Sequence, residues 1–451
     1  MKKRVRISTT QLILLSFLFA ILLGSFLLSL PISTKNGSSV SYIDALFTAT
    51  TATCVTGLVT LPTVTTWSTF GQIIILILIQ IGGLGIITVL SGIAVAANRK
   101  MKLKDSRLIS DAFNISSLDG LSKFVKKVIL GTLIIEGIGA VLYMTVFVPQ
   151  FGLRGIWISI FNSVSAFCNA GIDIIAQDSL CDYATNPAIN LITSALIILG
   201  GLGYIVWWDL LRVIKNFKKQ RFKCFRYLTL HSKIVLSITA ILIFGGAFLI
   251  FIFEYSNPQT IGTMSLFDKL QVSFFQSVTT RTAGFATIPQ ENLTDTSAII
   301  SLLLMFIGGS PVGTAGGVKT VTVAVLVFTA YAAITNKNDV SVFNRSLPKQ
   351  VTRKAVAVSV MSFLIMSVST ILLSAVTDAS FLDVLYETVS ATATVGLTRN
   401  LTPILDLWGK IIIICTMYLG RIGPISLAVA FTYSKESLNN IKNPTEEISV
   451  G

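Results

Sequence analysis

The chain has 451 residues, of which 53% are hydrophobic and only 12% are charged, and its formal net charge is +14. A soluble globular protein carries roughly twice this share of charged residues, so the composition excludes a water-soluble fold and indicates a multi-pass membrane protein. The basic excess points to membrane topology and contact with anionic membrane lipid rather than nucleic acid, because no basic stripe is interleaved with aromatic residues.

Apolar runs long enough to cross about 30 Å of hydrocarbon recur along the chain. Eight membrane spans are predicted, at about residues 10–30, 71–97, 125–148, 189–211, 233–253, 298–333, 355–377 and 409–432. A backbone inside hydrocarbon must satisfy its own polar groups, so these spans are expected to be helices and the fold class all-α. The first span is too long for a cleavable signal peptide and lacks a small-residue cleavage site.

Charge patterning predicts the orientation of these spans. Most Lys and Arg residues lie at the N-terminus, in the segments 98–127, 212–233 and 334–354, and in the tail after residue 433. The positive-inside rule therefore places both termini and these segments in the cytoplasm. The opposite loops carry carboxylates that either attract cations to an outer mouth or are simply solvated. They are Asp44, Asp173, Asp178, Asp182, Glu254, Asp268, Glu291, Asp295, Asp378, Asp383 and Asp406.

One glycine phrase recurs four times at nearly constant spacing. Gly57, Gly171, Gly284 and Gly396 are 114, 113 and 112 residues apart. An aromatic residue stands ten positions before each glycine and an apolar residue directly after it: Phe47, Phe161, Phe274 and Tyr386, then Leu58, Ile172, Phe285 and Leu397. Fixed offsets of this kind indicate internal repeats. Four repeats are expected at 1–97, 98–211, 212–333 and 334–432, followed by a cytoplasmic tail at 433–451.

The segment before each glycine is apolar but too short to cross a bilayer: 44–56, 157–170, 268–283 and 383–395. Between two spans, such a segment can enter as a helix and return as extended chain only where protein or water covers it. Inward backbone carbonyls on the return can replace the water shell of a cation, and the helix C-terminus favours positive charge. A single such glycine is more often a packing residue, but four in register predict eight transmembrane helices plus four re-entrant pore helices around one pseudo-four-fold pore.

The four phrases resemble the filters of the Trk/Ktr/HKT superfamily of potassium transporters, and nearly the whole chain resembles the Ktr-type membrane subunit. The phrases are Thr56-Gly57-Leu58, Asn169-Ala170-Gly171, Arg281-Thr282-Ala283-Gly284-Phe285 and Thr394-Val395-Gly396-Leu397. Because the chain begins almost directly with the first repeat, without extra leading spans, the Ktr type is favoured.

The resemblance implies a transporter rather than an enzyme, with K+ as the transported ion and no organic cofactor. Glycine at all four positions implies potassium selectivity. The implied ion-binding filter comprises Val55, Thr56, Gly57, Asn169, Ala170, Gly171, Thr282, Ala283, Gly284, Thr394, Val395 and Gly396. The family pattern also implies potassium uptake across the plasma membrane, a homodimer, and a separate cytoplasmic ring of nucleotide-binding (RCK-type) Rossmann subunits.

The sixth predicted span has an anomalous middle that contains Pro311 and five glycines: Gly308, Gly309, Gly313, Gly316 and Gly317. A continuous helix is not expected there, so the span is predicted to be broken, with its irregular middle lining the pore below the filter. The run up to Lys319 resembles a phosphate-binding loop only superficially, because Val318 stands where that loop requires glycine.

In the resembled family this loop is an intramembrane gate, and Arg421 matches an arginine that lies in the pore beside it. A buried arginine within a span is costly and usually functional, although Arg421 alternatively reaches the cytoplasmic surface. Lys319 is interpreted either as a gate residue or as an anchor at a helix end. Arg281 is expected to brace the filter through carbonyls or a carboxylate such as Glu387.

Three further readings stay open from the sequence. Mid-span Glu136 is either a partner to a buried donor or coupling ion, or a hydrogen-bonded packing residue. A secondary symporter that couples sodium to potassium or another small solute would need inverted halves with matching broken helices, whereas one break is evident here. A membrane enzyme is disfavoured because His231 is the only histidine, and five cysteines without CxxC spacing argue against zinc or a disulfide framework.

Overall fold

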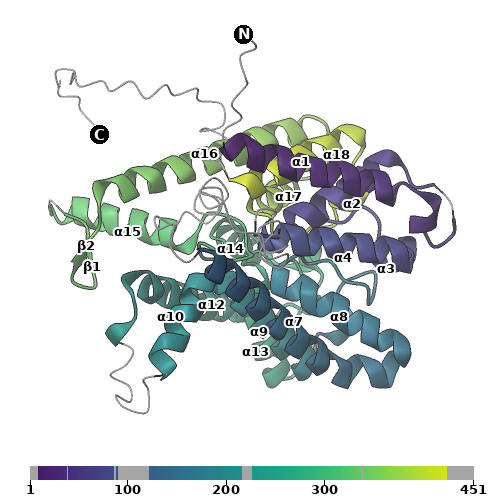
Figure 1. The fold of residues 1–451 in the computed structure, drawn as a ribbon, viewed down its shortest axis with the longest axis horizontal. Coiled ribbons are helices and arrows are strands. Elements are labelled where there is room, and N and C mark those ends of the chain that lie inside the picture. Colours follow the sequence, from purple (N-terminus) through teal and green to yellow (C-terminus); the bar gives the residue numbers. More distant parts are fainter. Residues whose placement is uncertain are drawn as a thin grey trace, which may run out of the picture.

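The computed structural model describes residues 9–37, 39–85, 88–89, 121–215, 226–337 and 339–423 (Figure 1). The described chain is almost wholly helical, as the composition predicts. Its only strands form a hairpin of β1 (Ser341–Val342) and β2 (Arg345–Ser346) in the basic segment 334–354. The tail 433–451, Cys224, the C-terminal parts of the predicted spans 71–97 and 409–432, most of the segment 98–127, and residues 216–225 of the segment 212–233 lie outside the described residues.

Four long helices are apolar enough to cross a membrane: α1 (Thr9–Leu28), α7 (Leu121–Phe151), α12 (Leu230–Glu254) and α16 (Lys349–Ser374). Their apolar side chains face mostly outward, and Phe19 and Phe244 are each 67% exposed. Large apolar surfaces of this kind are stable only where lipid or another protein covers them. They match the predicted spans at 10–30, 125–148, 233–253 and 355–377.

Each long helix is followed by a short helix: α2 (Tyr42–Cys54), α8 (Leu153–Cys168), α13 (Leu266–Thr279) and α17 (Phe381–Ala393). In α13 and α17 the hydroxyls of Ser265 and Ser380 accept a hydrogen bond from the backbone N–H of Asp268 and Asp383, and thereby fix the helix start. These helices begin two to four residues before the predicted segments.

The remaining main helices, which we call the inner helices, are α4 (Thr69–Leu84), α9 (Pro187–Leu202), α14 (Asp295–Phe306) and α18 (Leu407–Ile422). Each starts at a side-chain cap, provided by Ser68, Asn186, Thr294 and Asp406 respectively. Helices α10 (Tyr204–Lys215) and α15 (Thr320–Ile334) continue α9 and α14. Short turns complete the described chain: α3 (Thr63–Thr66), η1 (Pro31–Ser33), η2 (Cys181–Tyr183), η4 (Gln290–Asn292) and η5 (Thr402–Ile404).

The fourth predicted span is not a single helix. Helices α9 and α10 meet at an angle of 100°. Gly203, between them, has φ +85°, a conformation that favours glycine, and the N–H of Tyr204 bonds to the carbonyl of Val312 instead of continuing α9. The expectation of one straight span at 189–211, and of only one mid-span break in the chain, was therefore wrong.

The helices close into a ring. Each short helix packs on the long helix before it, and each inner helix packs on the next short helix along the chain: α4 on α8, α9 on α13, α14 on α17, and α18 back on α2. In Figure 1, α2 and α17 lie in the upper part of the molecule and α8 and α13 in the lower part. The four short helices thus come together from segments spread over more than 300 residues.

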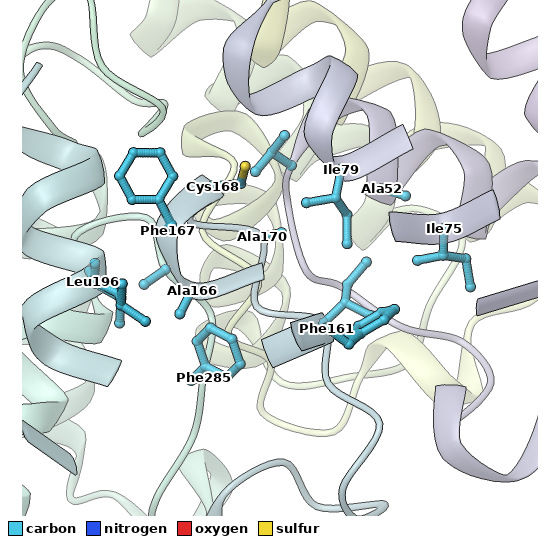
Figure 2. Packing of buried hydrophobic residues seen from close by; sticks show 14 of the residues in the cluster. Ala52, Ile75, Ile79, Phe161, Ala166, Phe167, Cys168, Ala170, Leu196 and Phe285 are labelled. Atoms are coloured by element: carbon cyan, nitrogen blue, oxygen red, sulfur yellow. The ribbon is translucent and has the colours of Figure 1, made fainter. Parts of the chain in front are cut away.

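The core lies around the short helices. Figure 2 shows Phe161 of α8 on the side of Ile75 and Ile79 of α4, and Phe167 of α8 on the side of Leu196 of α9. All of them belong to one buried cluster, which also includes Phe285. Three of the repeated aromatics (Phe47, Phe161 and Tyr386) have no exposed surface, whereas in the third copy it is Phe275, one residue later, that is fully buried. Burial of these rings fixes the short helices in place, because each aromatic ring removes a large apolar area from water or lipid.

Candidate functional site

The four repeated glycines, here called the glycine ring, lie against one another. Gly57, Gly171, Gly284 and Gly396 all have positive φ, from +63° to +97°. A Cβ on Gly57 would lie 2.6 Å from the carbonyl oxygen of Ala170, and a Cβ on Gly171 the same distance from that of Ala283. Conformation and space therefore both require glycine.

The same kind of contact joins the third glycine to the fourth segment and the fourth glycine to the first segment. A Cβ on Gly284 would lie 2.5 Å from the carbonyl oxygen of Val395, and one on Gly396 would collide with the carbonyl oxygen of Thr56. Each glycine thus meets the carbonyl of the residue that precedes the next glycine. Backbone oxygens from all four segments converge here, and such an array can coordinate a cation that has shed its water.

The residues that lead up to the four ring glycines, here called the glycine segments, share one backbone path. The residue two positions before each glycine is left-handed, with φ between +52° and +64°: Val55, Asn169, Thr282 and Thr394. Three of these residues directly end a short helix, whereas α13 ends three residues before Thr282. Since these short helices run toward the ring, their C-terminal partial negative charges point toward it.

Buried hydroxyls hold the segments in this path. The N–H groups of Gly57 and Gly396 each donate to a side chain six residues earlier, Thr51 and Ser390, at 3.0 Å. Ser165 accepts from the N–H of Ile172 at 3.2 Å, and Thr279 donates to the carbonyl of Phe285 at 2.6 Å. These hydroxyls were missed from the sequence, although a hydroxyl residue stands six positions before three of the glycines and five before Gly284.

Beside the ring lies the break in the sixth predicted span, residues 307–319, which we call the interrupted segment. Helix α14 ends at Phe306 and α15 begins at Thr320, so the predicted break is confirmed. The segment is fixed to the end of α9, because the N–H groups of Ser310 and Thr314 donate to the carbonyls of Gly201 and Gly200 at 2.8 and 3.1 Å.

The glycines of the interrupted segment sit where no side chain fits. A Cβ on Gly308 would collide with the carbonyl of Gly316, and one on Gly309 with the side chain of Ala315. A Cβ on Gly313 would lie 2.9 Å from the carbonyl of Gly200, and Gly317 has φ +65°. The segment is therefore packed against its surroundings as an ordered structure.

Arg421 joins the interrupted segment to the opposite side of the site. Its Nη1 donates to the carbonyl of Thr314 at 2.8 Å and its Nη2 to the carbonyl of Gly82 at 2.6 Å. Its side chain does not reach toward the surface, so the alternative interpretation of Arg421 was wrong. Lys319 donates from Nζ to the carbonyls of Ala315 and Gly316, at 2.6 and 3.4 Å, within its own segment.

A cavity of about 530 Å³ adjoins these groups. Arg421 and Lys319 line it, together with the ends of α4 and α18, Thr392 and Ala393 of α17, and residues of α1 and α16. No carboxylate is among the described residues that line it. Three cationic side chains, Lys319, Lys354 and Arg421, therefore line the cavity, and the interrupted segment borders it.

The inner helices approach the short helices through glycines that sequence reasoning did not select. A Cβ on Gly82, Gly200 or Gly420 would collide with the carbonyl of Thr53, Phe167 or Thr392, each four residues before a ring glycine. Arg421 follows Gly420 as Gly83 follows Gly82. The fourth copy of the pattern thus places an arginine where the first has glycine.

Two predicted braces have different partners. Arg281 donates from Nη2 to the carbonyl of Gly308 at 3.3 Å. Of the two predicted kinds of partner it therefore has a carbonyl and not the carboxylate of Glu387, and that carbonyl belongs to the interrupted segment rather than to the filter. Glu387 is fully buried and accepts from the hydroxyls of Thr398, at 2.7 Å, and Thr402. Its carboxyl therefore ties α17 to the turn that follows the ring.

Glu136 has buried donors as partners. Its Oε2 accepts from Gln80 Nε2 at 3.2 Å and its Oε1 from the thiol of Cys168 at 3.8 Å. It joins α4, α7 and the end of α8, and no cation contacts it among the described residues. These contacts fit both a partner to buried donors and a hydrogen-bonded packing residue.

Several outer carboxylates are committed to structure. Asp44 pairs with Lys410 at 2.6 Å and Asp383 with Arg399 at 2.7 Å, while Glu254 is buried and accepts from the hydroxyls of Thr260 and Thr294. Asp173, two residues after Gly171, has no such cation. Burial raises the pKa of its carboxyl to about 6, although the N–H of Ile175 opposes this shift with a hydrogen bond at 3.2 Å.

Comparison with known proteins places this arrangement. A family model described as a cation transport protein, TrkH, matches residues 7–442. The chain belongs to the TrkH family. It is 40% identical over 450 residues to the Ktr system potassium uptake protein B of Bacillus subtilis, and the match covers 100% of this chain and 98% of that protein.

Two further proteins resemble the chain over nearly its whole length. The potassium/sodium uptake protein NtpJ of Enterococcus hirae is 38% identical, with 100% of this chain and 99% of that protein covered. The crystal structure of the potassium transporter TrkH from Vibrio parahaemolyticus has a TM-score of 0.75 at 18% identity, over 96% of this chain and 87% of that one. The structural likeness shows a shared fold, and the family is one of membrane cation transporters.

Proposed function

We propose that the chain is the potassium-translocating membrane subunit of a Ktr-type uptake system of the cell membrane. The observation that carries the proposal is the closed glycine ring, in which the atoms nearest each glycine position belong to the backbones of the neighbouring segments. A potassium site needs several oxygens to replace the water shell of the ion, and the four converging carbonyls support such a site. The names of the relatives from Bacillus subtilis and Enterococcus hirae support potassium uptake.

In this proposal the four repeats, 1–97, 98–211, 212–333 and 334–432, each contribute two spans and one re-entrant pore helix. The pore helices are α2, α8, α13 and α17, and the filter binds K+ through the segments that end at the four ring glycines. The closed order of contacts between inner and short helices supports a pseudo-four-fold pore. Both termini lie in the cytoplasm.

The proposed gate comprises the interrupted segment, with Gly308, Gly309, Gly313, Gly316, Gly317 and Lys319, together with Arg421. Two observations support this role: the segment borders the cavity beside the ring, and Arg421 holds it through the carbonyl of Thr314. The positive charge of Arg421 opposes cation passage, and its hydrogen bonds keep the segment in place.

We further propose that the chain works as a homodimer with a cytoplasmic RCK-type nucleotide-binding ring. The support is the likeness to membrane components of Ktr systems, named as one part of a system. Such a ring would act on the gate through the basic segments that connect the repeats.

Rubidium uptake into potassium-loaded proteoliposomes tests this function. The purified chain is assayed with and without a regulatory ring, with external potassium or sodium as competitor. Potassium is expected to block uptake where equal sodium does not, and Gly284→Ser is expected to reduce this discrimination. The proposal would be refuted if potassium and sodium blocked uptake equally, or if Gly284→Ser kept the wild-type preference for potassium. It would also be refuted if the chain showed no uptake even with the regulatory ring present.

A sodium-coupled symporter is the second candidate. The bend at Gly203 and the interrupted segment give two broken spans, and one relative is named as a potassium/sodium uptake protein. The breaks fall in two successive repeats of the same orientation, however, rather than in inverted halves. Rubidium uptake that requires a sodium gradient would favour this candidate, whereas uptake driven by potassium exchange alone would favour the pore.

A further inference from the structure

The interrupted segment is hydrogen-bonded to the glycine segments themselves. The N–H of Gly316 donates to Thr282 Oγ1 at 3.1 Å, and Thr314 Oγ1 donates to the carbonyl of Phe167 at 3.0 Å. Thr282 lies two residues before Gly284, and Phe167 lies four residues before Gly171. Both threonine side chains are fully buried, so water does not compete for these bonds.

Thr314 is bound on three sides at once. Its N–H donates to the carbonyl of Gly200 at 3.1 Å, its hydroxyl to Phe167, and its own carbonyl accepts from Arg421 at 2.8 Å. A side chain on the neighbouring Gly316 would also collide with Thr394 Oγ1. The part of the interrupted segment around Thr314 and Gly316 therefore contacts the second, third and fourth copies of the glycine phrase at once.

The bond at Thr282 acts on an unfavourable backbone. Thr282 is β-branched and has φ +64°, a conformation that such residues rarely adopt without support from their surroundings. If the segment withdraws, the buried N–H of Gly316 and the buried hydroxyl of Thr282 both lose this partner. The path of the third glycine segment and the position of the interrupted segment are thus coupled.

We propose that Thr282 and Thr314 couple the interrupted segment to the glycine ring, so that displacement of the segment changes ion preference as well as passage. This inference rests on the proposed function, because it gives the gate a second effect on the filter. The two threonines are positioning residues: they set the backbone path that leads to Gly284 and Gly171.

The test uses the full chain in proteoliposomes with Thr282→Val and Thr314→Val, which keep shape and remove the hydroxyl. Loss of one buried hydrogen bond changes an equilibrium by about three- to tenfold. Each valine variant is expected to raise rubidium uptake without the regulatory ring and to reduce the preference of potassium over sodium as competitor, each by about this factor. Thr282→Ser and Thr314→Ser keep the hydroxyl and should restore the wild-type preference.

Thr320→Val is the matched control. Its hydroxyl is buried and lies 3.1 Å from Ser310 Oγ, but this pair touches no glycine segment. It is expected to leave ion preference unchanged. If Thr282→Val and Thr314→Val raise uptake while ion preference stays at the wild-type value, the segment acts only as a barrier and the coupling is refuted.

Hydrogen–deuterium exchange gives a readout that does not depend on transport. In Thr314→Val, peptides that cover residues 307–319 and peptides that cover 167–171 and 282–286 are expected to exchange faster together. Faster exchange confined to 307–319 would refute the coupling even if the chain transports no potassium. A thermal transition close to that of the wild type confirms that each variant is folded.

Discussion

At the residue scale, the site depends on oxygen atoms supplied by backbone rather than by charged side chains. The glycine ring brings four carbonyls to four glycines, and buried hydroxyls keep each chain in its path. Thr51, Ser165, Thr279 and Ser390 perform this task with slightly different geometry. Thr51, Ser165 and Ser390 each accept from a buried N–H that would be costly to leave without an acceptor, and Thr279 donates to the carbonyl of Phe285.

Ser390→Ala tests the supporting hydroxyls. It leaves the N–H of Gly396 buried without its acceptor, which costs about 1–3 kcal/mol. We expect a lower thermal transition in detergent and weaker discrimination between potassium and sodium. Ser390→Thr keeps the hydroxyl and copies Thr51 of the first copy, so it should behave like the wild type. An alanine variant with unchanged stability and selectivity would show that the hydroxyl is dispensable.

Asp173 gives the outer side of the ring a pH dependence. With its pKa raised to about 6, its carboxyl is ionised at pH 7.5 and neutral at pH 5. The negative charge that attracts cations is therefore present above the pKa and lost below it. Rubidium uptake at low rubidium should fall by about two- to fivefold as external pH drops across this range.

Rubidium uptake by the Asp173→Asn variant should be low at pH 7.5 and nearly independent of pH. A variant with the full wild-type pH dependence would rule out Asp173 as the titrating group.

At the element scale, the interrupted segment and the inner helices share the site with the short helices. The segment is tied to α9 by backbone bonds, to the third glycine segment through Arg281 and Thr282, and to α18 through Arg421. Bonds to three elements define one position for a segment that has no regular structure of its own. Its movement requires several of these bonds to break together.

Arg421→Met tests the hydrogen bonds of Arg421 apart from its packing. It removes the donors to Thr314 and Gly82 and the positive charge, while it keeps much of the side-chain volume. We expect rubidium uptake without the regulatory ring to rise by about tenfold or more, because buried charge-assisted hydrogen bonds are worth about 1.5–3 kcal/mol each.

Arg421→Lys is the matched control, since it keeps the charge but cannot bridge two carbonyls in a fixed fork. If uptake by Arg421→Lys is raised like that of Arg421→Met, the bridge between the two carbonyls is what restricts uptake. If it stays at the wild-type value, the positive charge is what restricts uptake. Unchanged uptake in both variants would contradict a gating role for Arg421.

The elements also show what the sequence could and could not predict. Pro311 and its neighbouring glycines marked the break in the sixth span, because no helix accommodates them. The bend at Gly203 escaped prediction, since glycine alone is tolerated in membrane helices and the bend depends on a contact with Val312, more than 100 residues away. The partners of Arg281 and Glu387 likewise depend on tertiary contacts that spacing does not reveal.

At the scale of the whole molecule, four similar segments form one closed ring within an apolar exterior. The contact of α18 with α2 joins the end of the described chain to its beginning, so the ring is complete within one chain. The four glycines and their spacing were predictable because each position requires glycine, both for its backbone conformation and for the lack of space for a side chain. The apolar faces of α1, α7, α12 and α16 leave the ring surrounded by surface suited to lipid.

The central claim is that the glycine ring binds dehydrated potassium. Its most direct test is an experimental structure of the chain in rubidium, with anomalous scattering used to locate the ion. We expect a rubidium peak on the axis of the ring, coordinated by the carbonyls of Thr56, Ala170, Ala283 and Val395, that excess potassium removes and an equal excess of sodium leaves in place. A peak only outside the ring, or one that sodium removes as readily as potassium, would contradict the account.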